Sequence, residues 1–192
     1  MSKIAEQIIT IGKAARVAAR DLALLATTVK NQALRAMAAA IRGQQETILA
    51  ANQKDMAAAR QKNLSDALID RLALNSDRVA AMANGLDMIA DLPDPVGVAL
   101  KKIQRPNGLE IVRVSTPIGV IGVIYESRPN VTVDAAGLCL KSGNAVILRG
   151  GSESFYSCSA IMSALQKGLR AVNVPLTAVQ FVPTVDRMAV DE

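Results

Sequence analysis

Two short polar segments, each directly after an apolar run, contain the side chains best suited to chemistry. Glu126–Asn130 reads ESRPN, and Arg149–Glu153 reads RGGSE. Neither segment is GxGxxG or ends in the Gly-Lys-Ser/Thr of a Walker loop, so a dinucleotide fingerprint is absent. Gly150 and Gly151 would let backbone N–H groups approach a phosphate at a helix N-terminus, with Arg149 adding charge. From the residues alone, an ordinary tight turn is slightly favoured over a phosphate site.

Asn130 and Arg128 each allow two interpretations. Asn130 follows a proline at the expected start of a helix, where asparagine commonly serves as an N-cap. Its amide could instead donate to an oxyanion that develops during a reaction. Arg128 could bind an anion or be solvated. The residues alone leave these alternatives open.

The absence of histidine removes several mechanisms. Without it the chain cannot supply Ser-His-Asp or Cys-His catalysis or a His-ligated zinc site. Cys139 and Cys158 are too far apart for a CxxC site, and both lie in apolar, helix-like surroundings. We therefore expect two buried bystander thiols in a reducing compartment, and no metal site.

The charge pattern favours a solvated basic surface over a nucleic-acid partner. The chain carries 22 Lys and Arg against 17 Asp and Glu, for a formal net charge of +5. These charges are scattered, and two Tyr and two Phe offer few platforms for stacking bases. No apolar run approaches the ~20 residues that a membrane span needs. A basic N-terminal segment interrupted by Glu6 and Asp21 favours a structural helix over a transit peptide, so we expect a cytoplasmic protein.

The chain divides into a helical part and an α/β part. In residues 1–95, apolar residues recur at spacings of three and four, which predicts helix packed on helix. Ser65 and Ser76 are the expected N-caps of two of these helices. Two prolines in 92–95 end the helical part.

Residues 96–115 predict a β-hairpin arm. Two strands, 96–105 and 109–115, flank the Asn-Gly turn of 106–108. Partial alternation predicts that one face of the second strand is exposed. A hairpin of this kind outside a sheet would dock on a neighbouring subunit.

Residues 116–192 predict a βαβαβ unit and therefore a doubly wound, parallel α/β sheet. Gly119–Tyr125 is a short apolar run expected to be a strand buried on both faces. Gly143 is the expected end of the first helix, and Thr184 the expected cap of a helix near the chain end. The other expected elements are helices Asn130–Ser142 and Glu153–Val172 and strands Ala145–Leu148 and Ala178–Val182.

Longer motifs identify a family. TPIGVIGVIYESRPNVTVD at 116–134 and LCLKSGNAVILRGGSES at 138–154 closely resemble gamma-glutamyl phosphate reductases, also called glutamate-5-semialdehyde dehydrogenases. These belong to the aldehyde dehydrogenase superfamily. ANQKDMAAARQKNLSDALIDRLALNSDR at 51–78 and LPDPVG at 92–97 resemble the amino-terminal region of the same family. The resemblance implies an aldehyde-dehydrogenase-like fold whose hairpin arm serves oligomerisation.

The resemblance also implies a reaction and residue roles. Family members use NADPH to reduce L-glutamyl 5-phosphate to L-glutamate 5-semialdehyde in proline biosynthesis, releasing phosphate. A cysteine thiolate displaces the phosphate, and hydride transfer then reduces the thioester. By this resemblance Asn130 would donate to the oxyanion, and Arg128 is a candidate for binding the substrate. The segment Arg149, Gly150, Gly151, Ser152 and Glu153 would line the cofactor site.

The chain also departs from the family pattern. Family members are about twice as long, and their catalytic cysteine and a later glycine-rich loop lie in the half that has no counterpart here. Neither cysteine of this chain matches the nucleophile's motif, so we expect this polypeptide alone to be inactive. The resemblance further implies a homodimer or larger homo-oligomer and a functional link to glutamate 5-kinase. Two alternatives are a truncated, non-catalytic paralogue that binds nucleotide or supports assembly, and a relative with a different acyl substrate.

Overall fold

The computed structural model describes residues 2–186 and 188–191 and shows a helical region, a parallel sheet and an extended hairpin. The helices are α1 (Lys3–Ala23), α2 (Thr27–Gly43), α3 (Gln45–Gln61), α4 (Asp66–Leu72), α5 (Ser76–Asp91), α6 (Asn130–Lys141), α7 (Phe155–Ala171) and α8 (Met188–Asp191), with 3₁₀ turns η1 (Ser152–Ser154) and η2 (Leu176–Ala178). The strands are β1 (Ala99–Gln104), β2 (Glu110–Val114), β3 (Val120–Ile124), β4 (Ala145–Arg149) and β5 (Val179–Phe181).

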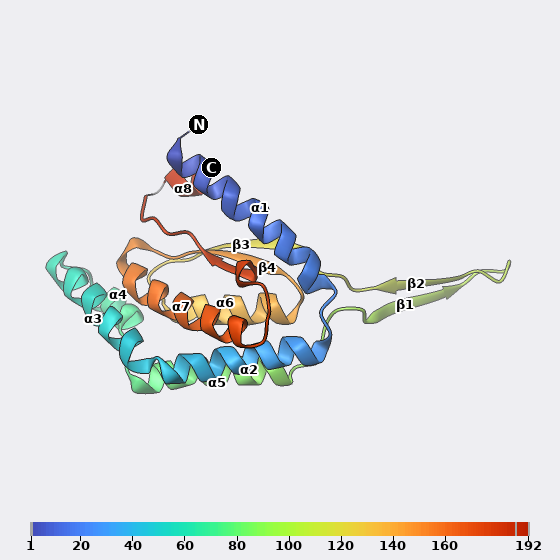
Figure 1. The fold of residues 1–192 in the computed structure, drawn as a ribbon, viewed down its shortest axis with the longest axis horizontal. Helices are drawn as coiled ribbons and strands as arrows, with labels where there is room; N and C mark the ends of the chain where they lie inside the picture. Colours follow the sequence, from blue (N-terminus) through green and yellow to red (C-terminus); the bar gives the residue numbers. More distant parts are fainter. Residues whose placement is uncertain (1, 187, 192) are drawn as a thin grey trace.

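Three parallel strands form the sheet in the order β3-β4-β5. Val120 lies opposite Ala145, and Ile124 lies opposite Arg149. Helix α6 connects β3 to β4 and α7 connects β4 to β5, which confirms the predicted βαβαβ order. Both connecting helices lie on one face of the sheet and α1 lies across the other (Figure 1), as same-direction right-handed crossovers require.

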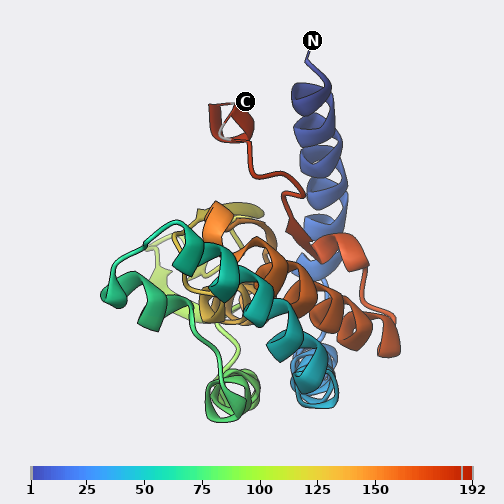
Figure 2. The ribbon, with the colours of Figure 1, turned by 90° about the vertical axis from the view of Figure 1, so that its left-hand side faces the viewer.

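A further helical layer covers α6 and α7. Figure 2 shows α2 and α5 side by side and almost end-on, beyond the sheet-covering helices. Their contact residues Leu34, Met37 and Leu86 are fully buried, as is Leu165 of α7. Gly168 makes the close approach of α7 to α2 possible, because a Cβ there would lie 2.5 Å from the Met37 backbone. The amphipathic stripes of the first 95 residues therefore build the platform on which the sheet rests.

Helix α6 ends as the sequence predicts. Gly143 has a φ of +73°, and its N–H donates to the Leu140 carbonyl at 3.1 Å. The next N–H, that of Asn144, donates to the Cys139 carbonyl at 2.8 Å. This pair of bonds is the Schellman ending, which favours glycine at the left-handed position.

The predicted caps of two other helices are wrong. Helix α5 is capped by Asn75, whose side chain accepts the Arg78 N–H at 2.8 Å, so Ser76 is already its first helical residue. Thr184 accepts the Asp186 N–H at 3.1 Å, and Asp186 in turn accepts the Met188 N–H at the start of α8. Several short polar side chains precede each helix, and sequence does not show which one reaches the free N–H groups.

The cap of α4 is only half as predicted. Ser65 occupies the N-cap position with extended backbone, as expected, but its hydroxyl accepts no hydrogen bond from the first turn of the helix. Backbone bonds to the Ser65 carbonyl from Leu68 and Ile69 start the helix instead.

Strand β3 differs from its prediction of burial on both faces. It is an edge strand within the described residues, since the sheet order places only β4 beside it. Ile124 is 67% exposed, whereas the central strand β4 is almost wholly buried. An apolar run shows that a strand can be buried, but the number of neighbouring strands decides whether it is.

The β1–β2 hairpin extends away from the body as a separate arm (Figure 1). Gly108 of the predicted turn has a φ of +84°, and its N–H donates to the Arg105 carbonyl at 3.0 Å. Every residue of both strands is exposed, so the prediction of a single exposed face in the second strand is wrong. The buried Lys30 ammonium pairs at 2.5 Å with the partly exposed Asp94 in the segment before β1.

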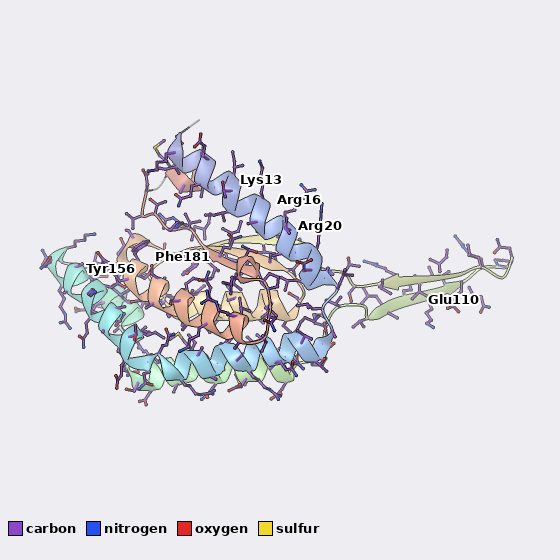
Figure 3. All side chains as sticks on the ribbon, viewed as in Figure 1. Lys13, Arg16, Arg20, Glu110, Tyr156 and Phe181 are labelled. Atoms are coloured by element: carbon purple, nitrogen blue, oxygen red, sulfur yellow. The ribbon has the colours of Figure 1, made fainter. Side chains whose placement is uncertain are left out.

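Basic side chains on α1 account for part of the positive charge. Lys13, Arg16 and Arg20 are exposed there, whereas the acidic Glu110 lies far out on the arm (Figure 3). Glu110 is 3.8 Å from the Lys102 ammonium across the hairpin. Within residues 2–186 and 188–191, no helix combines the length and the apolar character that a membrane crossing requires.

Candidate functional site

The carboxyl ends of β3 and β4 border a pocket of about 600 Å³, which we call the glycine pocket. Its walls are Tyr125–Ser127 after β3 and Arg149–Glu153 after β4, with Leu64 and Leu68 from the helical region and Val185 after β5. All five residues that the sequence assigned to a cofactor site therefore lie together. Ligands of open α/β sheets bind at this edge.

The space around the two glycines is limited, and neither has a positive φ. A Cβ at Gly150 would lie 3.3 Å from both the Cys158 sulfur and the Tyr125 ring. A Cβ at Gly151 would lie 2.9 Å from Glu153 Oε2, the end of a flexible side chain, and at an ordinary contact distance of 3.4 Å from the backbone nitrogen of Ser127. Larger residues would push the two loops apart and deform the pocket.

Arg149 is a buried side chain that ties the sheet edge together. One guanidinium nitrogen donates to the Gly150 carbonyl, and the other donates to Val185 O at 3.1 Å and to Asp186 O at 3.4 Å. Its Nε is buried and has no hydrogen-bond partner among the described residues. A buried donor without a partner costs about 1–3 kcal/mol. The pocket therefore fits a ligand that brings an acceptor to this atom.

Glu153 presents a hydrogen-bonded carboxylate to the same pocket. It accepts from Ser152 Oγ at 2.9 Å and from Ser127 Oγ at 3.4 Å. Burial opposes its ionisation, but bonds from its own backbone N–H and from the two hydroxyls outweigh burial and lower the pKa below its usual 4.5. The carboxylate is therefore ionised at neutral pH and available to accept bonds from ligand hydroxyls.

The N-terminus of α7 does not serve as the phosphate site that the Gly-Gly pair could have supported. The N–H groups of Tyr156 and Ser157 donate to the Asp55 carboxylate at 3.2 and 2.7 Å. Ser157 Oγ adds a third bond to Asp55 at 2.6 Å. An internal carboxylate from α3 thus occupies the position where a ligand anion would bind.

Sequence reasoning missed Asp55 and its neighbour Asn52. Asn52 donates to the Leu72 carbonyl at 2.9 Å and accepts the Leu74 N–H at 2.8 Å, which ties α3 to the end of α4 and to the loop before α5. Both side chains lie on the buried stripe of α3, between Ile48 and Ala59. The sequence did contain a signal for them: two polar residues interrupt an apolar helical stripe. Buried polar groups need hydrogen-bond partners, so such residues indicate contacts to other elements.

Both cysteines are buried and free, as the sequence predicts. Burial raises the pKa of Cys139 to about 11, and burial likewise raises the pKa of Cys158. Both thiols are therefore protonated at neutral pH and make poor nucleophiles. In the part of the chain that the structure describes, no group of three or more Cys, Asp or Glu side chains could hold a metal ion.

Arg128 and Asn130 lie in a second pocket, of about 410 Å³, which we call the arginine pocket. Its lining includes Asp70, Arg71 and Ala73 of α4 and its following loop, Leu74, Arg78, Ala81 and Met82 around the start of α5, and Arg128, Asn130 and Asp134 around the start of α6. The ESRPN segment thus contributes its first residues to the glycine pocket and its last residues to the arginine pocket.

Asn130 is not the N-cap of α6. Pro129 occupies that position, with helical backbone angles and no side chain that can accept a bond. The Asn130 amide instead donates to Asp134 Oδ2 at 3.2 Å, one turn along the helix. Burial raises the pKa of Asp134, and the bond from Asn130 opposes this shift. The structure therefore removes the capping alternative and places the Asn130 side chain at the rim of the arginine pocket.

The fold and the sequence define the class of protein. A profile of the aldehyde dehydrogenase family matches residues 2–192. The chain belongs to the aldehyde dehydrogenase family. An acetylating aldehyde dehydrogenase from Geobacillus thermoglucosidasius shares this fold at 13% identity, with a TM-score of 0.75 over 98% of this chain and 39% of that one.

Closer relatives carry a more particular name. A gamma-glutamyl phosphate reductase from Paramagnetospirillum magneticum is 61% identical over 94% of this chain and 43% of its own length. The crystal structure of gamma-glutamyl phosphate reductase from Thermotoga maritima has a TM-score of 0.93 at 40% identity, over 95% of this chain and 44% of that one. This chain therefore spans less than half the length of the relatives it matches.

Proposed function

We propose that this chain forms the cofactor-side portion of an NADPH-dependent reductase that converts L-glutamyl 5-phosphate to L-glutamate 5-semialdehyde with release of phosphate. The observation that carries this proposal is the 61% identity to a gamma-glutamyl phosphate reductase over almost the whole chain. The family assignment supports a nicotinamide cofactor, and the pocket at the sheet edge supplies a place for it.

The glycine pocket would hold the cofactor, and NADPH when bound would supply the hydride. The unpartnered Nε of Arg149 would donate to an acceptor of the dinucleotide. Glu153 and Ser152 would bind ribose hydroxyls, because an ionised carboxylate forms charge-assisted bonds with such donors. Gly150 and Gly151 would keep the loops close enough to form the wall against which the cofactor rests.

The arginine pocket would hold the acyl substrate. There the Asn130 amide would donate to the developing oxyanion, with Asp134 holding the amide in place. Arg128 lies on the same pocket and would bind an anionic part of the substrate. Because Cys139 and Cys158 are buried and protonated, the nucleophilic thiol of this reaction is expected outside this chain.

The arm would bring subunits together in a homodimer or larger assembly. Its exposed apolar side chains, including Leu100, Ile111 and Val114, would be buried in such a contact. A kinase that phosphorylates the side-chain carboxylate of glutamate must supply the substrate, which is the basis of the expected link to glutamate 5-kinase. The biosynthetic role would place the protein in the cytoplasm.

A composite reductase tests this proposal. In it, this chain is continued by the carboxyl-terminal remainder of the Paramagnetospirillum relative, and NADPH oxidation is followed with L-glutamyl 5-phosphate. We expect turnover by the composite and none by the 192-residue chain alone. NADPH oxidation by the chain alone would contradict the absence of a nucleophile. An inactive but folded and oligomeric composite would instead favour the non-catalytic alternative.

A further inference from the structure

The arginine pocket brings together charges of both signs. Arg71, Arg78 and Arg128 face Asp70 and Asp134 around one opening. Arg78 has partners within the protein: it forms an ion pair with Asp70 Oδ1 at 2.8 Å and donates to the Ala73 carbonyl at 2.7 Å. This clamp closes the loop between α4 and α5 and removes Arg78 and Asp70 from the groups available to a ligand.

The remaining charged groups have capacity for a ligand. Among the described residues, no side chain pairs with the Arg71 or Arg128 guanidinium, so the pocket retains two cations. Asp134 uses Oδ2 to accept the Asn130 amide, and no described residue donates to its Oδ1. An available carboxylate oxygen therefore lies in the same pocket as two available guanidinium groups.

We propose that the arginine pocket recognises the α-amino-acid end of the substrate, with Arg128 and Arg71 binding the α-carboxylate and Asp134 binding the α-ammonium group. This inference rests on the proposed function and assigns the glutamyl end of that substrate to named side chains. The γ-acyl end then extends towards the Asn130 amide.

Two further features of the pocket match such a ligand. Met82 and Ala81 give it an apolar floor suited to the methylene groups of a glutamyl chain. Two cations and one anion leave a net positive pocket, which complements an acyl phosphate whose α-charges cancel and whose phosphate is negative. A simple dicarboxylate would satisfy the arginines but place no cation against Oδ1 of Asp134, which accepts no bond from a described residue.

Titration of the 192-residue protein with L-glutamate tests this inference. Backbone amide NMR shifts are followed, with glutarate and 4-aminobutyrate as probes that lack the α-ammonium and the α-carboxylate group. We expect saturable shifts at 71, 78, 128 and 134 with L-glutamate, and a dissociation constant about tenfold or more weaker for either analogue, the effect of one lost charge-assisted bond. Equal affinity for glutarate and L-glutamate, or no saturable shift in the pocket, would overturn the proposal.

Two variants separate recognition from folding. Asp134→Asn should remove the preference for L-glutamate over glutarate, whereas Asp77→Asn, an exposed change on α5 outside the pocket, should retain it. Arg128→Gln should weaken L-glutamate and glutarate alike, with Arg60→Gln as its matched control. Asp134→Asn with an unchanged preference would refute the role of Asp134. Because the titration requires no turnover, a composite reductase that is inactive while the chain discriminates L-glutamate would refute the proposed function alone.

Discussion

The glycine pocket and the arginine pocket lie near the same edge of the sheet but are built by opposite means. In the glycine pocket, polar side chains such as Arg149 and Glu153 are mostly paired within the protein, and missing Cβ atoms set the shape. In the arginine pocket, Arg71 and Arg128 pair with no side chain among the described residues, and charged side chains rather than glycines make up half of the lining.

This difference teaches how one loop can serve two purposes. Ser127 faces Glu153 in the first pocket, while Arg128 and Asn130, on either side of Pro129, line the second, so the division falls between Ser127 and Arg128. Substitutions in the glycine pocket should therefore affect folding and cofactor together. Substitution of Arg71 or Arg128 in the arginine pocket should affect binding of the acyl substrate and change the free energy of unfolding little.

The largest expected effect concerns Asn130 in the composite reductase. Asn130→Ala should lower kcat about 100-fold or more, because an oxyanion donor of this kind is worth that much. Stability should hold, since the Asn130 side chain does not cap α6. Gln53→Ala, at an exposed amide on α3, is the matched control. Normal turnover with a lower melting temperature would contradict the assignment.

The next effect contrasts packing in the two pockets. Gly150→Val should lower the free energy of unfolding by about 2 kcal/mol, because the added atoms meet Cys158 and Tyr125. Arg128→Gln should change it by no more than about 0.5 kcal/mol, as for other exposed sites. Urea unfolding measures both, with Gly122→Val, at an uncrowded glycine of strand β3, controlling for valine on non-helical backbone. Equal destabilisation by Gly150→Val and Arg128→Gln would contradict the claim that the two pockets differ in their contribution to stability.

Cofactor binding gives a smaller effect. Glu153→Ala in the composite reductase should raise KM for NADPH about tenfold, the value of one charge-assisted bond to a ribose hydroxyl. The measurement is steady-state kinetics at saturating acyl phosphate, with Glu46→Ala on exposed α3 as control. A KM for NADPH that does not move would remove Glu153 from the cofactor site.

The smallest expected effect is on the pH dependence of stability, to which Glu153 and Asp134 contribute with opposite sign. Glu153 has a lowered pKa when folded, so its contribution to stability is present above pH 4.5 and is lost as pH falls through the folded pKa. Asp134 has a raised pKa, so its contribution is largest below pH 3.8 and is lost as pH rises through the folded pKa. The free energy of unfolding of Glu153→Gln and of Asp134→Asn is compared with that of the parent from pH 3 to 7. The two differences should change with pH in opposite directions, each by about 0.5 kcal/mol or less. Slopes of the same sign would contradict these shifts.

Local signals predicted much of this structure. Gly143, the Asn-Gly turn and the strand–helix order follow from rules that act over a few residues, and each is present. Long-range contacts decided the features that sequence missed. Asp55 reaches the start of α7 across about half the chain, and β3 is exposed because its only described neighbour is β4. The motif residues and their separate cofactor and substrate roles were named in advance, but the division of the ESRPN segment between two pockets was not.

The claim that one pocket binds the cofactor and the other the acyl substrate is tested most directly by comparing KM values of single and double variants. KM for NADPH and KM for L-glutamyl 5-phosphate are measured for three variants of the composite reductase: Glu153→Ala, Arg128→Gln and the double variant. We expect Glu153→Ala to raise only the KM for NADPH, Arg128→Gln to raise only the KM for the acyl phosphate, and the double variant to show both changes independently. A variant in either pocket that raises both KM values by the same factor would contradict the account.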